Sequence, residues 1–412
     1  MTEHRTTLSP AHLARRHSAE ARFRLYGLVA LGVTGLFLAY LLFDIVSRSI
    51  PAFTTQQVTA SVLIDPAKVD AADPAKGNFT ALSKDAWLGL FPAVESRADR
   101  KKLTGLLSSG AADALRELVV ADPGLVGKTL TVPLQVSDDA VLFYQNANRL
   151  LSDKEMIWLQ SLSDRGLVTT GLNMAFFTNG DSREAELAGI RGALTGSLLT
   201  IAVTLLLSLP LGVAAAIYLE EFARRNRFTD VIEVNINNLA AVPSIVFGLL
   251  GLAVFLSFFG MPRSAPLVGG LVLALLVLPT IIIASRAALR SVPPSIKEAA
   301  FGVGASHQQA VFHHVLPLAF PGILTGTILA VARALGETAP LLMIGMVAFI
   351  VDVPGGITDA ATVLPVQIFL WSDLPEQAFQ SRTAAAIVVL LVVLFVLNAL
   401  AIVLRRKFER RW

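Results

Sequence analysis

The chain has 412 residues, of which 54% are apolar and only 16% are charged, an apolar fraction above that of an ordinary soluble domain. It contains no cysteine, which excludes disulfides, thiolate chemistry and Cys-ligated metal sites. The formal net charge of +3 does not indicate a nucleic-acid partner, because the basic residues flank long uncharged stretches, a pattern typical of orientation in a membrane.

Six stretches are long and apolar enough to cross a bilayer. A helix rises about 1.5 Å per residue, so about 30 Å of hydrocarbon requires roughly 20 apolar residues. The stretches are residues 25–43, 192–219, 239–259, 265–285, 321–350 and 383–404. We therefore predict an all-α membrane protein with six transmembrane helices. The first is too long for a signal-peptide core, and we expect it to stay as an uncleaved anchor.

Lysine and arginine residues indicate how these helices are oriented. One set of segments holds 16 of them: residues 1–24, 222–235, 286–320 and 405–412. The short segments on the other side hold two, Arg263 and Arg382. Positively charged residues remain on the cytoplasmic side. We therefore expect a multi-pass protein of the bacterial inner membrane, in contact with lipid, with both termini in the cytoplasm.

Residues 48–187 then lie outside the cytoplasm and are long enough for a small domain. Residues 129–136 and 141–144 are typical of two strands of a hairpin, and Pro133 would confine the first strand to a sheet edge. Residues 153–162 follow a capping-box pattern and are predicted to form a helix. The sequence thus predicts a small α+β periplasmic domain beside the transmembrane helices.

No cofactor is expected on this chain. Gly127 and Lys128 imitate the end of a phosphate-binding P-loop, but the glycine that such a loop needs five residues earlier is replaced by Asp122. The chain is therefore not expected to hydrolyse ATP. His313 and His314 are neighbours and would point about 100° apart on a helix, so we expect no metal site there either.

The predicted cytoplasmic loop, residues 286–320, contains two short helices. Pro293 breaks the preceding helix, residues 295–301 can form the first short helix, and Gly304 allows a sharp change of direction. Residues 306–315 can form the second. The physical pattern leaves two interpretations open: an amphipathic connector on lipid headgroups, or a docking element for a cytoplasmic protein.

The same loop resembles the EAA motif of the permeases of ABC importers. Glu298-Ala299-Ala300 is followed by three residues and Gly304, and eleven further residues lead to Leu316. His314 departs from the aliphatic residue that the pattern expects. In that family the loop is the coupling helix, which docks into an ATPase subunit that binds ATP and Mg²⁺. The resemblance implies a coupling role for these residues: Ser295, Lys297, Glu298, Ala299, Ala300, Gly304, Leu316 and Pro317.

Two charged residues interrupt the fifth stretch. Arg333 is expected near mid-membrane, where an arginine costs about 2.5–3.5 kcal/mol on insertion scales. Glu337 follows at i+4 on the same helical face, so the pair can neutralise itself. Two interpretations stay open: a structural ion pair that faces the bundle, or an anion path in which the guanidinium fork binds phosphate oxygens.

Two further runs resemble signatures of phosphate permeases: residues 332–342, ARALGETAPLL, and residues 239–255, LAAVPSIVFGLLGLAVF. The ending of the first run resembles the PstA family more than its sister family PstC. The N-terminal anchor and the large external segment resemble extended PstA variants. The resemblance implies a type I ABC importer permease that carries inorganic phosphate. It places three residues along the phosphate path: Arg333, Glu337 and Thr338.

The resemblance also implies the partners: a PstC-type permease in a heterodimer, two PstB-type ATPase subunits, and the periplasmic phosphate-binding protein PstS. The division of the chain that we predict is a cytoplasmic N-terminus at 1–24, a first helix at 25–47, a periplasmic domain at 48–187, a permease domain at 188–404 with the EAA loop at 286–320, and a cytoplasmic C-terminus at 405–412. Two alternatives remain: a permease for another oxyanion such as sulfate or molybdate, and a membrane sensor with residues 48–187 as its input domain.

Overall fold

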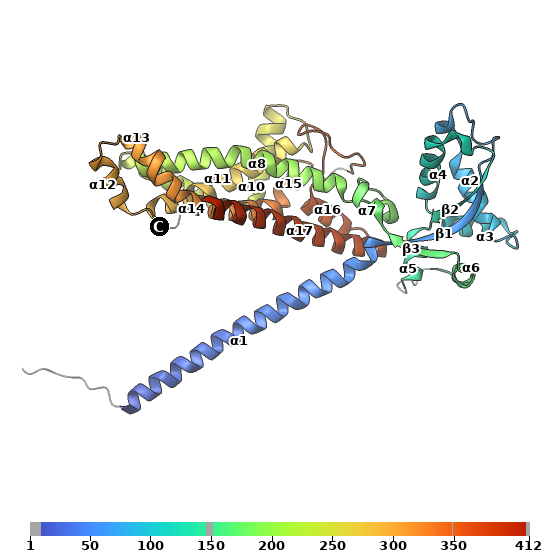
Figure 1. Cartoon of the computed structure of the whole chain (residues 1–412), viewed down its shortest axis with the longest axis horizontal. Coiled ribbons are helices and arrows are strands. Elements are labelled where there is room, and N and C mark those ends of the chain that lie inside the picture. The colour runs from blue at the N-terminus through green and yellow to red at the C-terminus, as the bar shows by residue number, and fades with distance from the viewer. Residues whose placement is uncertain (1–9, 146–150, 348, 409–412) are drawn as a thin grey trace, which may run out of the picture.

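The computed structural model describes residues 10–145, 151–347 and 349–408, so parts of both predicted termini and position 348 of the fifth stretch lie outside the described residues. Figure 1 shows a long N-terminal helix, a lobe that contains a sheet, and a helical bundle, which meet at one junction. We call residues 54–178 the sheet lobe and residues 191–408 the helical bundle.

The N-terminal helix α1, Pro10–Ser49, contains the first predicted span. No proline follows its first position, so nothing interrupts the backbone hydrogen bonds. The most apolar part of α1 is not covered by the rest of the described chain, and Figure 1 shows the helix diverging from the bundle. Its side chains are therefore available to lipid or to another subunit.

The sheet lobe is built around three antiparallel strands in the order β2-β1-β3. The central strand β1, Thr54–Leu63, pairs with β2, Thr129–Gln135, and with β3, Val168–Leu172. Alternate residues of β1 are buried, as expected for a strand with one face on a core. The predicted strand at 129–136 is confirmed, and Pro133 lies on the edge strand β2, where a missing N–H group is tolerated.

The second strand of the predicted hairpin is wrong. Residues 141–144 belong to the helix α5, Asp138–Tyr144, which has Ser137 at its N-cap position and Asp138 and Asp139 in its first turn. The Ser137 hydroxyl makes no capping hydrogen bond, but acidic residues beside the positive end of the helix dipole favour a helix start. These local signals outweigh the β-propensity of the valine and the aromatic residues that follow.

Five further helices complete the sheet lobe: α2 Phe79–Gly89, α3 Arg97–Gly105, α4 Gly110–Ala121, α6 Asp153–Asp164 and α7 Met174–Thr178. Short 3₁₀ turns connect the elements: η1 Ile50–Phe53, η2 Pro74–Lys76, η3 Pro123–Leu125 and η4 Ala185–Leu187. The predicted helix at 153–162 is confirmed as α6, and its capping box is formed by Ser152 and Glu155. In the core of the lobe, buried Trp87 donates a hydrogen bond to the carbonyl oxygen of Leu103.

The helical bundle contains these helices: α8 Arg191–Ile217, α9 Arg227–Ala240, α10 Ser244–Gly251, α11 Pro266–Arg290, α12 Pro294–Gly302, α13 His307–Gln309, α14 Leu316–Gly336, α15 Ala339–Met343, α16 Leu364–Ser372 and α17 Gln377–Phe408. Three π turns extend them: η5 Tyr218–Phe222, η6 Leu252–Phe258 and η7 Ala310–Val315. Among the described residues, five helices are long and apolar enough to cross a membrane, and one bent pair can serve as a sixth.

The bent pair replaces the third predicted span. Residues 239–259 were expected to form one helix, but α9 ends at Ala240 and the next helical segment starts at Ser244. The two helical segments meet at 100°. Pro243 has an extended backbone at the break, and proline cannot donate the hydrogen bond that would continue the helix through this position.

The fifth predicted span, residues 321–350, is wrong at both ends. The helical segment begins at His307, continues through the π turn η7 into α14, and ends at Gly336. Local π geometry lets a membrane helix accommodate proline, which explains why Pro317 does not separate the two parts. At the other end Glu337 is extended. Pro340 removes the hydrogen bond that the carbonyl of Gly336 would accept in a continuous helix.

Glycines bring α14 close to α11. A Cβ atom at Gly326 would lie 2.2 Å from the Cβ of Ala284, and one at Gly322 would lie 2.7 Å from the Cβ of Ala288. Small residues let helix backbones meet, so this pair of glycines permits the close approach of the two helices. Gly196 also lies at a close approach, but its neighbour is the carbonyl oxygen of a loop residue before α16.

We expect Gly326→Ala to lower the thermal stability of the detergent-solubilised protein. The added methyl group overlaps Ala284, and overpacking of this kind costs about 1–3 kcal/mol. Gly336→Ala in the same helix is the matched control, because no atom lies within 4 Å of its added Cβ. Equal melting temperatures for the two variants would contradict the packing account.

Candidate functional site

The loop between α11 and α14 folds as a helix–turn–helix. α12 starts with Pro294, and Gly304 has φ of +86°, a left-handed conformation that favours glycine. α13 begins with a capping box in which the backbone N–H of Ser306 donates to Oε1 of Gln309 and the backbone N–H of Gln309 donates to the Ser306 hydroxyl. The two predicted short helices are present, and the second continues into α14.

The predicted coupling residues lie on two sides of α12 and its turn. Ser295, Glu298, Ala299 and Gly304 are exposed, Lys297 is half-buried, and Ala300 is buried. Leu316 and Pro317 are half-buried at the start of α14. The tip of the loop also presents two apolar side chains that the motif did not indicate, Phe301 and Val303, and Val303 is 86% exposed. This surface is suited to contact with another protein.

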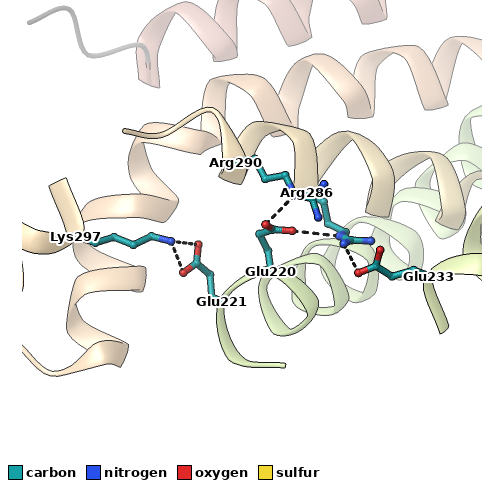
Figure 2. Close-up of polar contacts among 6 residues, drawn as sticks. All are labelled: Glu220, Glu221, Glu233, Arg286, Arg290 and Lys297. Atoms are coloured by element: carbon teal, nitrogen blue, oxygen red, sulfur yellow. Dashed lines mark hydrogen bonds and ion pairs between the residues drawn. The ribbon is translucent and has the colours of Figure 1, made fainter. Parts of the chain in front are cut away.

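Ion pairs hold the inner side of the loop against the end of α8 (Figure 2). The ammonium of Lys297 lies 2.7 Å from both carboxylate oxygens of Glu221. The neighbouring Glu220 accepts a hydrogen bond from Nε of Arg290 at 2.8 Å, and Arg286 contacts Glu220 at 3.4 Å. These contacts join the end of α8 to α11 and α12, 66 to 76 positions later in the chain. In the sequence, the feature that could have drawn attention to Glu220 and Glu221 is their position as adjacent glutamates at the end of an apolar stretch.

Arg333, Glu337 and Thr338 meet at the break between α14 and α15. Arg333 lies in the last turn of α14, Glu337 is the residue after the helix, and Thr338 precedes α15. Nε of Arg333 lies 3.4 Å from Oε1 of Glu337. The expectation that both side chains share one face of a continuous helix is wrong, since the helix ends between them; they approach each other across its end.

The Arg333 side chain points away from the core of the bundle. It is 42% exposed, whereas Glu337 is 18% exposed. Leu329, one turn earlier on the same face of α14, is also exposed, while Ala330 and Ala334 are buried. α14 has 21 residues, so this charged pair lies about 30 Å along the helix from the loop that carries α12.

The N-terminal and C-terminal parts of the chain match different families of known proteins. Residues 208–412 match the family described as binding-protein-dependent transport system inner membrane component. The phosphate transport system permease protein PstA 1 of Mycobacterium tuberculosis (strain ATCC 25618 / H37Rv) is 33% identical over 223 residues, which cover 54% of this chain and 71% of that protein. PstA of Yersinia pestis is 32% identical and is matched over 84% of its length by 61% of this chain. The chain belongs to the PstA-type ABC permeases.

Other similarities extend over part of this PstA-type permease. The probable ABC transporter permease protein YqgI of Bacillus subtilis is 38% identical over 172 residues, which cover 42% of this chain and 58% of that protein. A solved structure of the MetNI methionine ABC transporter is 17% identical with a TM-score of 0.40, and it covers 54% of this chain and 96% of that one. Residues 10–152, with α1 and much of the sheet lobe, match a domain of unknown function.

A second charged cluster joins the sheet lobe to the permease helices. Arg382, in α17, is 6% exposed. It donates to the carbonyl oxygen of Ala188 at 2.9 Å, and its guanidinium lies over the ring of Phe176. Asp138, in α5, accepts a hydrogen bond from the backbone N–H of Ala185. Burial raises the pKa of Asp138 to about 8; the charge of Glu186 and a hydrogen bond with it add to the rise, and the charge of Arg382 opposes it.

We expect this junction to lose stability as the pH rises. The folded protein binds the Asp138 proton more tightly than the unfolded chain does. The stabilising effect is therefore complete below about pH 4 and is lost as the pH rises towards about 8. Asp138→Asn should remove this dependence of stability on pH, because an amide does not titrate in this range. The amide oxygen can still accept the hydrogen bond from the backbone N–H of Ala185. Melting curves between about pH 5 and pH 9 test this, with the exposed Asp113→Asn as the control; equal slopes for the two variants would contradict it.

Proposed function

We propose that this chain is the permease subunit of an ATP-driven importer for inorganic phosphate. It forms the translocation path together with a second permease of the PstC type. Two PstB-type ATPase subunits bind ATP and Mg²⁺, and a PstS-type binding protein delivers phosphate. The observation that carries the proposal is the Arg333 guanidinium, exposed on the open face of α14 at a helix break, in a chain whose relatives are named phosphate permeases.

The contact between Arg333 and Glu337 suits a transient anion site. Arginine offers a planar set of donors that matches two phosphate oxygens. Glu337 contacts Nε at 3.4 Å, which is long for a charge-assisted hydrogen bond, and no contact with the two Nη atoms occurs among the described residues. A passing anion can therefore bind the Nη atoms and displace Glu337. Because the side chain faces away from its own bundle, the second permease completes the path.

The orientation follows from the ends of the bundle. Figure 1 places α12, α13 and the end of α17 at one end and the sheet lobe at the other. The basic segments 286–320 and 405–408 lie in the first group of elements. Positive charge favours the cytoplasmic side, so the loop faces the ATPase subunits and the sheet lobe faces the periplasm. The exposed Phe301 and Val303 contribute apolar surface to the docking contact.

The substrate is tested with the complex that copurifies with this chain, reconstituted in lipid vesicles with its binding protein. We expect ATP hydrolysis to rise on addition of phosphate and to stay at its basal rate with sulfate or molybdate. Uptake of labelled phosphate should require ATP on the side of the coupling loop. Stimulation by sulfate or molybdate without stimulation by phosphate would overturn the substrate assignment and leave the permease assignment intact.

A further inference from the structure

The end of α8 has an unusual local geometry. The last turn, η5, is a π turn in which the backbone N–H of Ala223 donates to the carbonyl of Tyr218 at 2.7 Å. Such turns occur frequently at functional sites. This turn contains Glu220 and Glu221 side by side in sequence, yet Figure 2 shows their carboxylates turned towards different helices. Glu220 contacts α11, whereas Glu221 contacts α12.

Glu221 touches both arms of the coupling loop. Its carboxylate contacts Lys297 of α12 with both oxygens at 2.7 Å. Its backbone carbonyl oxygen lies 2.8 Å from Nε2 of His307, the first residue of α13. The ring of His307 packs edge-on against Phe222 and is stacked on Phe301 at 6.0 Å. The two arms that flank Gly304 are thus fixed to one short turn of α8.

The Glu221 carboxylate is buried enough for this contact to persist. Its side chain is 2% exposed, and Lys297 shields it. A buried carboxylate is costly to leave without its cation, so a displacement of α12 that separated the two groups is opposed. By contrast, Glu220 and its partner Arg290 join α8 to α11 without contacting the loop.

The chain itself connects the loop only to α11 and α14. Glu221 adds a connection to α8, which packs closely along α11: a Cβ atom at Gly270 would lie 2.5 Å from Val203, and one at Gly212 would lie 2.7 Å from Ile281. Interiors packed this tightly transmit displacement. A displacement of the loop can therefore move α8, α11 and α14 together.

We propose that Glu221 is the positioning residue that transmits movement of the coupling loop to α8, through the contact of its carboxylate with Lys297. The proposal rests on the ATP-driven function proposed above. When the contact is broken, α11 and α14 still follow the loop through the chain, whereas α8 follows only through its apolar packing. ATP hydrolysis then continues with less phosphate moved for each ATP.

The test measures ATP hydrolysed and phosphate imported in the same proteoliposomes. Glu221→Gln keeps the shape and removes the charge, and this side chain is too buried to contact the ATPase directly. We expect the ratio of phosphate to ATP to fall roughly 2- to 30-fold, the range for couplings of this kind. Arg290→Met is the matched control, because it removes an ion pair of the same turn without touching the loop; its ratio should stay close to that of the wild type.

The exchanged pair, Glu221→Lys with Lys297→Glu, restores opposite charges and should recover most of the ratio. If Glu221→Gln fails to assemble with the ATPase, the exchanged pair alone tests whether Glu221 transmits the movement. An unchanged ratio in Glu221→Gln, or no recovery in the exchanged pair, would overturn the transmission role while wild-type phosphate import continued. Absence of phosphate import by the wild type would instead count against the proposed function.

Discussion

Phosphate uptake should fall steeply when Arg333 is replaced by alanine. The guanidinium is exposed on the open face of α14 with Glu337 beside it, and alanine removes all donors that could bind the anion. Hydrogen bonds to a charged group contribute about 1.5–3 kcal/mol, which corresponds to roughly 10- to 150-fold in rate. The measurement is the initial rate of labelled phosphate uptake, normalised to the amount of inserted permease.

Two variants separate a role in the path from a role in folding. Arg333→Lys keeps the charge but loses the planar fork, so we expect intermediate uptake. Leu329→Ala changes the same exposed face one turn earlier and should keep uptake close to that of the wild type. If Arg333→Ala inserted normally and transported phosphate at the wild-type rate, the pair would have only a structural role.

Arg382→Met should destabilise the protein more than any other single change considered above. Arg382 is the buried cation beside Asp138 and Glu186. Removing one partner of a buried charged group costs about 3–5 kcal/mol, because Glu186, joined by Asp138 above about pH 8, is left without its cation. The hydrogen bond to the carbonyl of Ala188 is lost as well. Thermal unfolding in detergent measures the effect, and limited proteolysis should show earlier cleavage between the sheet lobe and α8.

Arg165 provides the matched control for this prediction. It also donates to a backbone carbonyl, that of Leu90, but it is exposed, so Arg165→Met should cost about 1 kcal/mol or less. Above about pH 8, where Asp138 is ionised, adding Asp138→Asn to Arg382→Met should recover part of the lost stability, because the effects of residues in one charged cluster are not additive. Equal destabilisation by Arg382→Met and Arg165→Met would show that the junction does not depend on the buried cation.

The transmembrane helices were the most predictable part of the fold, since a long apolar stretch allows few other structures. Predictions failed where backbone chemistry interrupts such a stretch. Pro243 turns the third predicted span into a bent pair, and Pro340 ends α14 before the fifth predicted span is complete. Hydropathy does not record these breaks. The second strand of the hairpin was predicted wrongly because the acidic residues that favour a helix start, Asp138 and Asp139, lie in the segment that was interpreted as a turn.

The helix–turn–helix with α12 and α13 could be predicted because its glycine and proline positions are close in sequence. The contacts behind it could not, because Lys297 and Glu221 are 76 positions apart, and neither residue carries a local signal of the other. The contacting residues at the junction are farther apart in sequence: Arg382 and Ala188 are separated by 194 positions. In the sequence Arg382 was only a charge between two apolar stretches, and its burial between the sheet lobe and the bundle is a property of the fold.

The proposed function requires that the loop with α12 and α13 faces the cytoplasm, where an ATPase can reach it. Because the chain contains no cysteine, single cysteines report the side directly: Val303→Cys at the tip of the loop, and Lys101→Cys on the exposed surface of the sheet lobe. In intact spheroplasts, a membrane-impermeant maleimide should label Lys101→Cys and leave Val303→Cys unlabelled until the membrane is opened. Labelling of Val303→Cys in sealed spheroplasts would contradict the account.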